Sequence, residues 1–227
     1  MRNKKAGGWS PSQSLHPPFQ HQQDLDTLPC ILMIIDFGHS FKDYNEILNF
    51  YGIWDCSCPV CGAKRSMHRH GKYHRNLILW EDGQLLETGG EILRLQCGSC
   101  CSTHAVLTMD IIPFFSYSLP AFLALIGLCL QPDGSVPKTE RDTGASYQLL
   151  YRMILIFHEY RERLTLLLRR ESLWSAAGSP LLRQLLPLLG QKSPPWMQSS
   201  FFRAYCSPVF LHRRITGAFP LYFGDLS

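Results

Sequence analysis

Two short stretches indicate the fold of this chain: CPVCG at residues 58–62 and CGSCC at residues 97–101. Each contains two cysteines separated by two residues, a spacing that lets both thiolates turn toward one ion. The two pairs together supply four sulfur ligands, Cys58, Cys61, Cys97 and Cys100. Zinc is the natural occupant of four tetrahedrally placed thiolates, because it has no redox chemistry and a structural site needs no open coordination position. The spacing therefore predicts one structural Zn²⁺ ion.

The segment between the two cysteine pairs is longer than the roughly 15–20 residues that usually separate the pairs of a zinc ribbon. Two strand-like runs, NLILW and EILRLQ, occur in it together with the turn signals EDGQ and TGGE. A hairpin inserted between the pairs explains the extra length, since longer surface loops cost little closure entropy. We therefore expect a small zinc-ribbon β module.

Other thiols and imidazoles nearby are alternative ligands. Cys56 and Cys101 adjoin the pairs, but Cys-x-Cys and directly adjacent cysteines chelate one ion poorly. Four histidines are also close in sequence, and we interpret them as solvated or phosphate-facing: His68, His70, His74 and His104. A site closed by four cysteines offers no nucleophile, and the sequence has no Walker loop, Gly-x-Ser-x-Gly or His-Glu-x-x-His motif. We therefore expect a protein that is not an enzyme.

The composition is typical of a soluble globular protein, with 227 residues of which 45% are hydrophobic and 18% charged. No secretory signal opens the chain, so we expect a cytoplasmic protein whose cysteines stay reduced. The uncharged residues 111–130 are numerous enough to cross a membrane. Pro113 and Pro120 interrupt their first half, however, and the remainder predicts a buried helix rather than a membrane span.

The sequence divides into four segments of an α+β protein. These are a disordered tail (1–27), a strand and helix leading into the zinc-ribbon module (28–110), a helical, helix-turn-helix-like region (111–172) and a C-terminal extension of unclear structure (173–227). The patterns predict a strand at 30–37, a helix at 40–52 and one long helix at about 146–170. The aromatic residues from Phe201 onward have no clear period, which favours a strand or loop packed on the core.

A basic run follows the first cysteine pair directly. GAKRSMHRHGKYHR, residues 62–75, contains no acidic residue. Its cations are Lys64, Arg65, Arg69, Lys72 and Arg75. The net charge of +4 permits a nucleic-acid partner, and a compact positive surface of this kind is suited to phosphate contacts. The alternative is an ordinary solvated face.

Residues 135–160 resemble a helix-turn-helix. Gly144 would occupy the sharp turn, Ser146 would cap the second helix, and Leu150 and Met153 would pack inward. The residues expected at the exposed N-terminal end, which enters a major groove in such motifs, are Ser146, Tyr147, Gln148, Tyr151 and Arg152. The first helix fits the motif less well, because it would contain Pro137.

The order of these motifs resembles a bacterial domain family of unknown function that is related to the N-terminal regions of insertion-sequence transposases. The matching stretches are IIDFGHSFKDY, CPVCGA, RHGKYHRN, LRLQCGSCCSTHAVL, IIPFFSYSL and TGASYQLLYRMI, within residues 30–170. The resemblance implies a zinc-binding module held by Cys58, Cys61, Cys97 and Cys100, then a DNA-contacting helix that begins at Ser146. The chain departs from it at Cys101, where such ribbons usually carry glycine, and at residues 137–142.

The expected function is that of a zinc-binding, DNA-binding protein without catalytic activity, with double-stranded DNA as partner and no membrane. A transposase nuclease core needs far more chain than follows Arg170. Two alternatives remain. One is a zinc-stabilised interaction module or accessory subunit that binds another protein or a second copy of this chain. The other is the remnant of a transposase that lacks its nuclease core.

Overall fold

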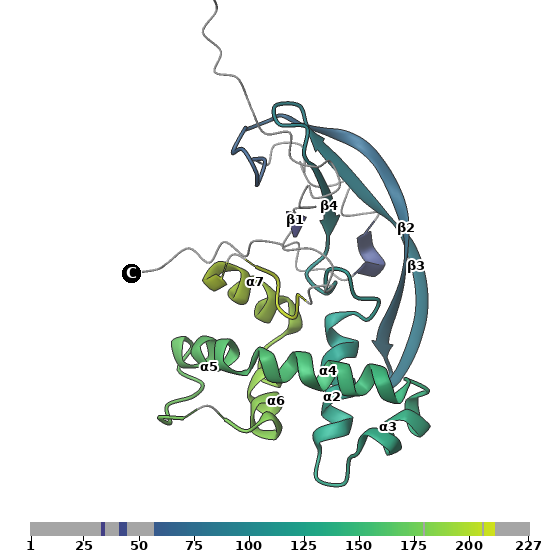
Figure 1. Ribbon diagram of the computed structural model, residues 1–227, viewed down its shortest axis with the longest axis vertical. Coiled ribbons are helices and arrows are strands. Elements are labelled where there is room, and N and C mark those ends of the chain that lie inside the picture. The colour runs from purple at the N-terminus through teal and green to yellow at the C-terminus, as the bar shows by residue number, and fades with distance from the viewer. Residues whose placement is uncertain (1–32, 35–40, 45–56, 179, 206, 212–227) are drawn as a thin grey trace, which may run out of the picture.

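The computed structural model describes residues 33–34, 41–44, 57–178, 180–205 and 207–211, so the expected tail at 1–27 lies outside the described residues. The fold is mixed α+β, as predicted, with a sheet and a group of helices (Figure 1). The strands are β1 (Met33–Ile34), β2 (Met67–Glu81), β3 (Gln84–Cys97) and β4 (Thr103–Leu107). The helices are the short 3-10 helix η2 (Phe41–Asp43), α2 (Leu119–Leu130), α3 (Val136–Thr143), α4 (Tyr147–Glu159), α5 (Arg161–Arg170), α6 (Leu182–Gly190) and α7 (Pro194–Tyr205).

The sheet has the strand order β1-β4-β3-β2. Strands β2, β3 and β4 are antiparallel, and β1 pairs parallel with β4. Of the strand predicted at 30–37, the structure describes only Met33 and Ile34, which form β1. The inserted hairpin is present as the long β2–β3 pair. Asp82 and Gly83 connect its strands with φ angles of 47° and 81°, which is the combination that a tight type I′ hairpin turn requires.

The second predicted turn, at TGGE, is wrong, because Gly89 and Gly90 lie inside β3. Both glycines make room for rings. A Cβ atom on Gly90 would lie 2.5 Å from Cζ of the buried Phe41, and one on Gly89 would lie 2.8 Å from the imidazole of His74. The backbone amide of Phe41 in turn donates to the buried carboxylate of Asp110 over 2.9 Å. These glycines therefore serve close packing rather than chain reversal.

The helices form the largest of three hydrophobic cores, and the hairpin tip joins it. Trp80 and Leu85, on either side of the hairpin turn, pack against the buried cluster of the helices. Phe210 stacks on Phe122 of α2 with ring centroids 4.5 Å apart, so the C-terminal segment shares this core. The four cysteines of the two pairs lie at the opposite end of the long, curved hairpin (Figure 1).

The long helix predicted at 146–170 is divided into α4 and α5 at Tyr160. The Tyr160 ring packs between Phe201 and Phe210, with centroid distances of 5.5 and 5.3 Å. Its hydroxyl donates to the carbonyl of Leu211 over 3.1 Å. Packing against residues more than 40 positions away thus determines where the helix divides, and the local hydrophobic pattern does not indicate this division.

The aromatic residues after 200 are partly helical, contrary to the strand or loop expected there. Ser193 accepts a hydrogen bond from the backbone amide of Trp196 over 3.3 Å, and α7 begins at Pro194. Serine followed by proline is a typical helix start. Serine caps the first turn, and the N–H that proline lacks would have no partner in that turn anyway. Among the described helices none is long and apolar enough to cross a membrane, and α2 has 12 residues.

Candidate metal centre and basic surfaces

The four predicted cysteines meet at the end of the hairpin. The sulfur atoms of Cys58, Cys61, Cys97 and Cys100 all lie within 4.8 Å of one another. The Cys58–Cys100 and Cys61–Cys97 sulfur pairs are each 3.7 Å apart. Two sulfurs bound to one tetrahedral zinc ion at ~2.3 Å lie about 3.8 Å apart. The spacing therefore fits a single tetrahedral ion held by four thiolates.

The two cysteine pairs occupy equivalent turns. In the first turn, the Gly62 amide donates to the Cys58 carbonyl over 2.8 Å, and the Cys58 amide donates to the Ala63 carbonyl over 2.9 Å. In the second, Cys101 donates to Cys97 and Cys97 donates to Ser102, both over 2.9 Å. Gly62 and Cys101 hold the same position, with φ angles of 72° and 60°. Glycine adopts this left-handed backbone conformation without strain. In the second turn a cysteine, Cys101, has to adopt it.

The thiols have unequal acidities without a metal. The side-chain hydrogen bond with Ser66, which has the largest effect, together with backbone hydrogen bonds lowers the pKa of Cys97 to about 5. A backbone hydrogen bond at Ala63 lowers the pKa of Cys61, but desolvation and the three neighbouring thiols together raise it to about 12. Thiolates this close to one another repel. A bound dication removes this conflict, because metal coordination deprotonates thiols outright.

The alternative ligands that the structure describes are not part of the four-cysteine cluster. Nε2 of the buried His104 lies 3.5 Å from the Cys58 sulfur, which places the imidazole beside a ligand rather than at a ligand position. Cys101 is exposed. The exposed imidazole of His68 contacts Gln96, and that of His74 contacts Asn76. His70 is exposed on β2, and Cys56 lies outside the described residues. The spacing did not single out Ser66, whose hydroxyl lies 3.1 Å from the Cys97 sulfur.

The basic run does not form one surface. Lys64 and Arg65 are exposed in the turn before β2, and Arg69 and Lys72 are exposed on the strand itself. Arg75 is only partly exposed. It donates from Nη2 to the carbonyls of Ile112 and Phe115 over 2.8 and 2.7 Å. Alternate residues of a strand face opposite sides, so Arg75 and Lys72, three positions apart, lie on different faces, and Arg75 holds the loop after β4.

The helix pair α3–α4 is connected by a short turn at Gly144, whose φ is 74°. Ser135 caps α3, and Pro137 lies in the first turn, where proline is tolerated. Leu150 and Met153 are buried. The residues of α4 and its N-terminus that the sequence assigned to DNA are all exposed: Ser146, Tyr147, Gln148, Tyr151 and Arg152.

The expected cap of α4 is wrong in one respect. Ser146 occupies the N-cap position, but its side chain makes no capping hydrogen bond. The carboxylate of Glu140 on α3 instead accepts from the Tyr147 amide over 2.9 Å. A carboxylate at a helix N-terminus satisfies a free N–H and also complements the helix dipole. Glu140 therefore ties the two helices together at their turn.

Two separate basic or polar surfaces result. One surrounds the four cysteines, and the other is the N-terminal end of α4 near the hairpin tip (Figure 1). The intervening strand β2 has 15 residues, about 45 Å if it were straight. Each surface therefore needs its own test.

Fold and site together define a mixed α+β protein with four cysteines positioned to bind one metal ion at the end of a long hairpin. The chain matches no protein-family model, and neither the curated proteins nor the solved structures contain a match to it.

Proposed function

We propose that this chain is a zinc-dependent, sequence-reading DNA-binding protein without catalytic activity, related to the N-terminal regions of transposases. The exposed N-terminal end of α4, presented by a preceding short helix and a glycine turn, carries this proposal. Gln148 and Arg152 are side chains that read base edges, and tyrosine hydroxyls contact phosphates. The zinc centre organises the hairpin and offers Lys64, Arg65, Arg69 and Lys72 to a second stretch of phosphates.

Zinc is supported by the donor set and its geometry. Four thiolates without an oxygen ligand favour zinc among the common divalent cations, and the 3.7 Å sulfur separations suit its bond length. All four positions are occupied by protein, so the ion has a structural role and leaves no place for a substrate.

DNA binding is tested with the full-length, zinc-loaded chain and a pool of random duplexes, from which bound sequences are selected. Arg152→Ala should weaken binding to the selected sequence about ten-fold and relax the preference at one position, since it removes a base contact. Binding should also weaken steeply as salt rises, because phosphate contacts release counterions.

Arg183→Ala is the matched control, because Arg183 is also an exposed helical arginine but lies on α6. It should leave binding unchanged. Equal losses in the two variants would indicate only nonspecific attraction, and the absence of any binding at low salt would end the proposal.

A second candidate function is protein interaction, and one observation favours it. Tyr147, Tyr151 and Leu155 are spaced four residues apart on α4 and are 44%, 51% and 47% exposed. The two tyrosine rings are nearly parallel, with centroids 6.4 Å apart. An apolar stripe of this kind suits the groove of a partner.

Leu155 distinguishes the two functions, because it lies two turns beyond the N-terminus of α4. Leu155→Lys should leave DNA affinity unchanged or slightly higher under our proposal. If the wild-type chain sediments as a dimer and the variant as a monomer, the stripe is an interface between copies, and interaction becomes the better supported function.

A further inference from the structure

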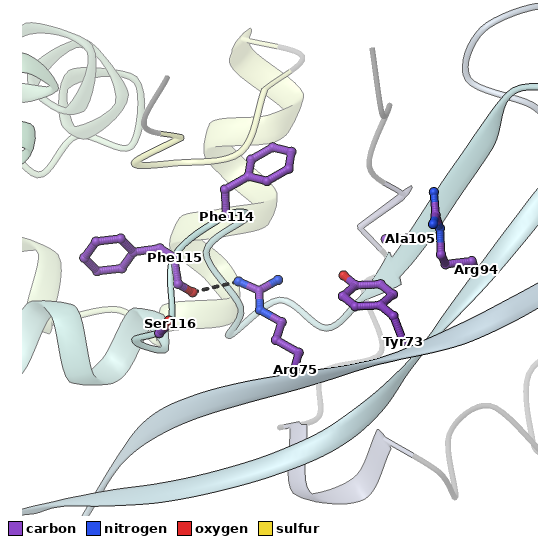
Figure 2. Close-up of a pocket in the computed structure, with 7 residues that line it drawn as sticks. All are labelled: Tyr73, Arg75, Arg94, Ala105, Phe114, Phe115 and Ser116. Atoms are coloured by element: carbon purple, nitrogen blue, oxygen red, sulfur yellow. Dashed lines mark hydrogen bonds between the residues drawn. The ribbon is translucent and has the colours of Figure 1, made fainter. Parts of the chain in front are cut away.

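A cavity of about 360 Å³ lies between the sheet and the loop that follows β4. Tyr73 and Arg75 of β2, Arg94 of β3 and Ala105 of β4 line one side, and residues 114–116 line the other (Figure 2). The strand register explains the convergence. Gly71 pairs with Arg94, and Arg94 pairs with Ala105, so these positions share one face with Tyr73 and Arg75.

The cavity is strongly positive. Two guanidinium groups line it, and no carboxylate is among the described residues around it. Arg75 is held by the carbonyls of Ile112 and Phe115 and by the side chain of Tyr73, while Arg94 donates to Oγ1 of Thr103 over 3.1 Å. Each guanidinium has five N–H donors, which exceeds these bonds, so both retain donors for an anion. Burial lowers the pKa of Arg75, but arginine stays protonated.

Phe114 stands at the rim in a conformation that its side chain disfavours. The Phe115 amide donates to the Ile112 carbonyl over 3.2 Å, which closes a turn with Pro113 and Phe114 at its centre. Phe114 has a φ of 60° and its side chain is 54% exposed. Glycine or asparagine is preferred at this place after proline in a type II turn. A strained, exposed aromatic residue that lines the same cavity as two arginines is a candidate for a functional role.

We propose that this cavity binds a phosphate monoester attached to one aromatic ring system, such as a nucleoside monophosphate, free or at the end of a nucleic-acid strand. The two arginines bind the phosphate, whose charge of about −1.5 to −2 balances theirs. Bidentate arginine–phosphate pairs are strong and directional. Phe114 stacks on the ring. The volume is at the small end of ligand sites, which suits one nucleotide. This site does not depend on the function proposed for α4.

The test is calorimetric titration of the zinc-loaded, full-length chain with AMP, adenosine and inorganic phosphate. AMP should bind, and adenosine and phosphate should each bind at least ten-fold more weakly. Arg94→Gln should weaken AMP binding about 10- to 100-fold, because it removes a charged hydrogen-bond partner.

A single-stranded decamer with and without a 5′-phosphate separates the two sources of the ligand. Phosphate-dependent binding of the decamer indicates a strand end, and binding of AMP alone indicates a free nucleotide.

Phe114→Gly separates ligand binding from folding. It should raise the melting temperature, because glycine relieves the positive φ, and yet weaken AMP binding several-fold. Ser172→Gly is the matched control, since Ser172 is exposed with a φ of 59° on the loop after α5. It should raise the melting temperature without affecting AMP. Equal affinity for AMP and adenosine, or wild-type affinity in Arg94→Gln, would overturn the proposal.

Discussion

Cys101 is the residue at which the metal centre departs from an ideal pair of turns. Its φ of 60° matches the 72° of Gly62 in the equivalent turn, and the left-handed region costs a non-glycine residue roughly 1–2 kcal/mol. Cys101→Gly should therefore stabilise the folded state by about 1 kcal/mol, which raises the melting temperature by about 2–4 °C in a chain of this size. Thermal unfolding followed by circular dichroism measures this shift.

Gly62→Ala is the converse control. A Cβ atom at Gly62 would meet nothing within 4 Å, so its cost is that of the backbone alone, and the melting temperature should fall by a similar amount. A Cys101→Gly variant with reduced metal content would contradict our assignment, because it would make Cys101 a ligand.

At the scale of single residues, spacing was enough to predict which four cysteines come together, since two Cys-x-x-Cys pairs carry their own geometry. Sequence position was not enough to place Arg75, which the basic run predicted to share one positive surface with Lys72. Strand alternation places these two residues on opposite faces, and Arg75 is held by the carbonyls of Ile112 and Phe115, which no pattern within the basic run indicates. Arg94 and Phe114 were not predicted either, because only the folded sheet brings them to one cavity.

The hairpin depends on a close approach between η2 and β3. A Cβ atom on Gly90 would lie 2.5 Å from Cζ of Phe41, and Phe41 is 7% exposed and fixed by its neighbour Tyr44, with ring centroids 5.4 Å apart. Gly90→Ala should therefore destabilise the fold by about 1–3 kcal/mol through overpacking. Urea unfolding, monitored by tryptophan fluorescence, measures the loss.

Gly71 provides the matched control on the partner strand, because a Cβ atom there would meet nothing within 4 Å. Gly71→Ala should change the unfolding free energy by no more than about 0.5 kcal/mol. Similar losses in both variants would mean that the strands require glycine for backbone reasons and that the Phe41 contact is incidental.

The elements were predictable where local chemistry determines them. Asp82-Gly83 produced the expected hairpin turn, and Gly144 ended α3 as expected. The errors at Gly90 and Tyr160 share one cause. In both places an aromatic ring from a distant part of the chain determines the conformation, and a pattern within one window contains no information about that ring.

At the scale of the whole molecule, the described residues form three hydrophobic cores along the hairpin, of which the middle one contains Phe41 and Tyr44. The core nearest the candidate metal centre is small and includes two of its four cysteines: Cys58, Met67, Leu93, Leu95, Cys97 and Val106. The largest core belongs to the helices, and Trp80 and Leu85 attach the hairpin tip to it. The sequence indicated both regions, but it did not show that the C-terminal segment completes the helical core through Phe210.

This arrangement predicts that metal loss opens one end of the molecule. Cys97→Ser should lose the zinc ion, because a structural site rarely survives the loss of one ligand, whereas Cys101→Ser should retain it. In hydrogen exchange, the amides of Met67–Lys72 and Leu95–Cys97 should lose protection in Cys97→Ser. Those of α2 and α4 should change little, because local opening follows the distribution of buried contacts. Exchange that accelerates uniformly would show one cooperative unit folded by the metal, and unchanged zinc content in Cys97→Ser would refute the four-cysteine centre.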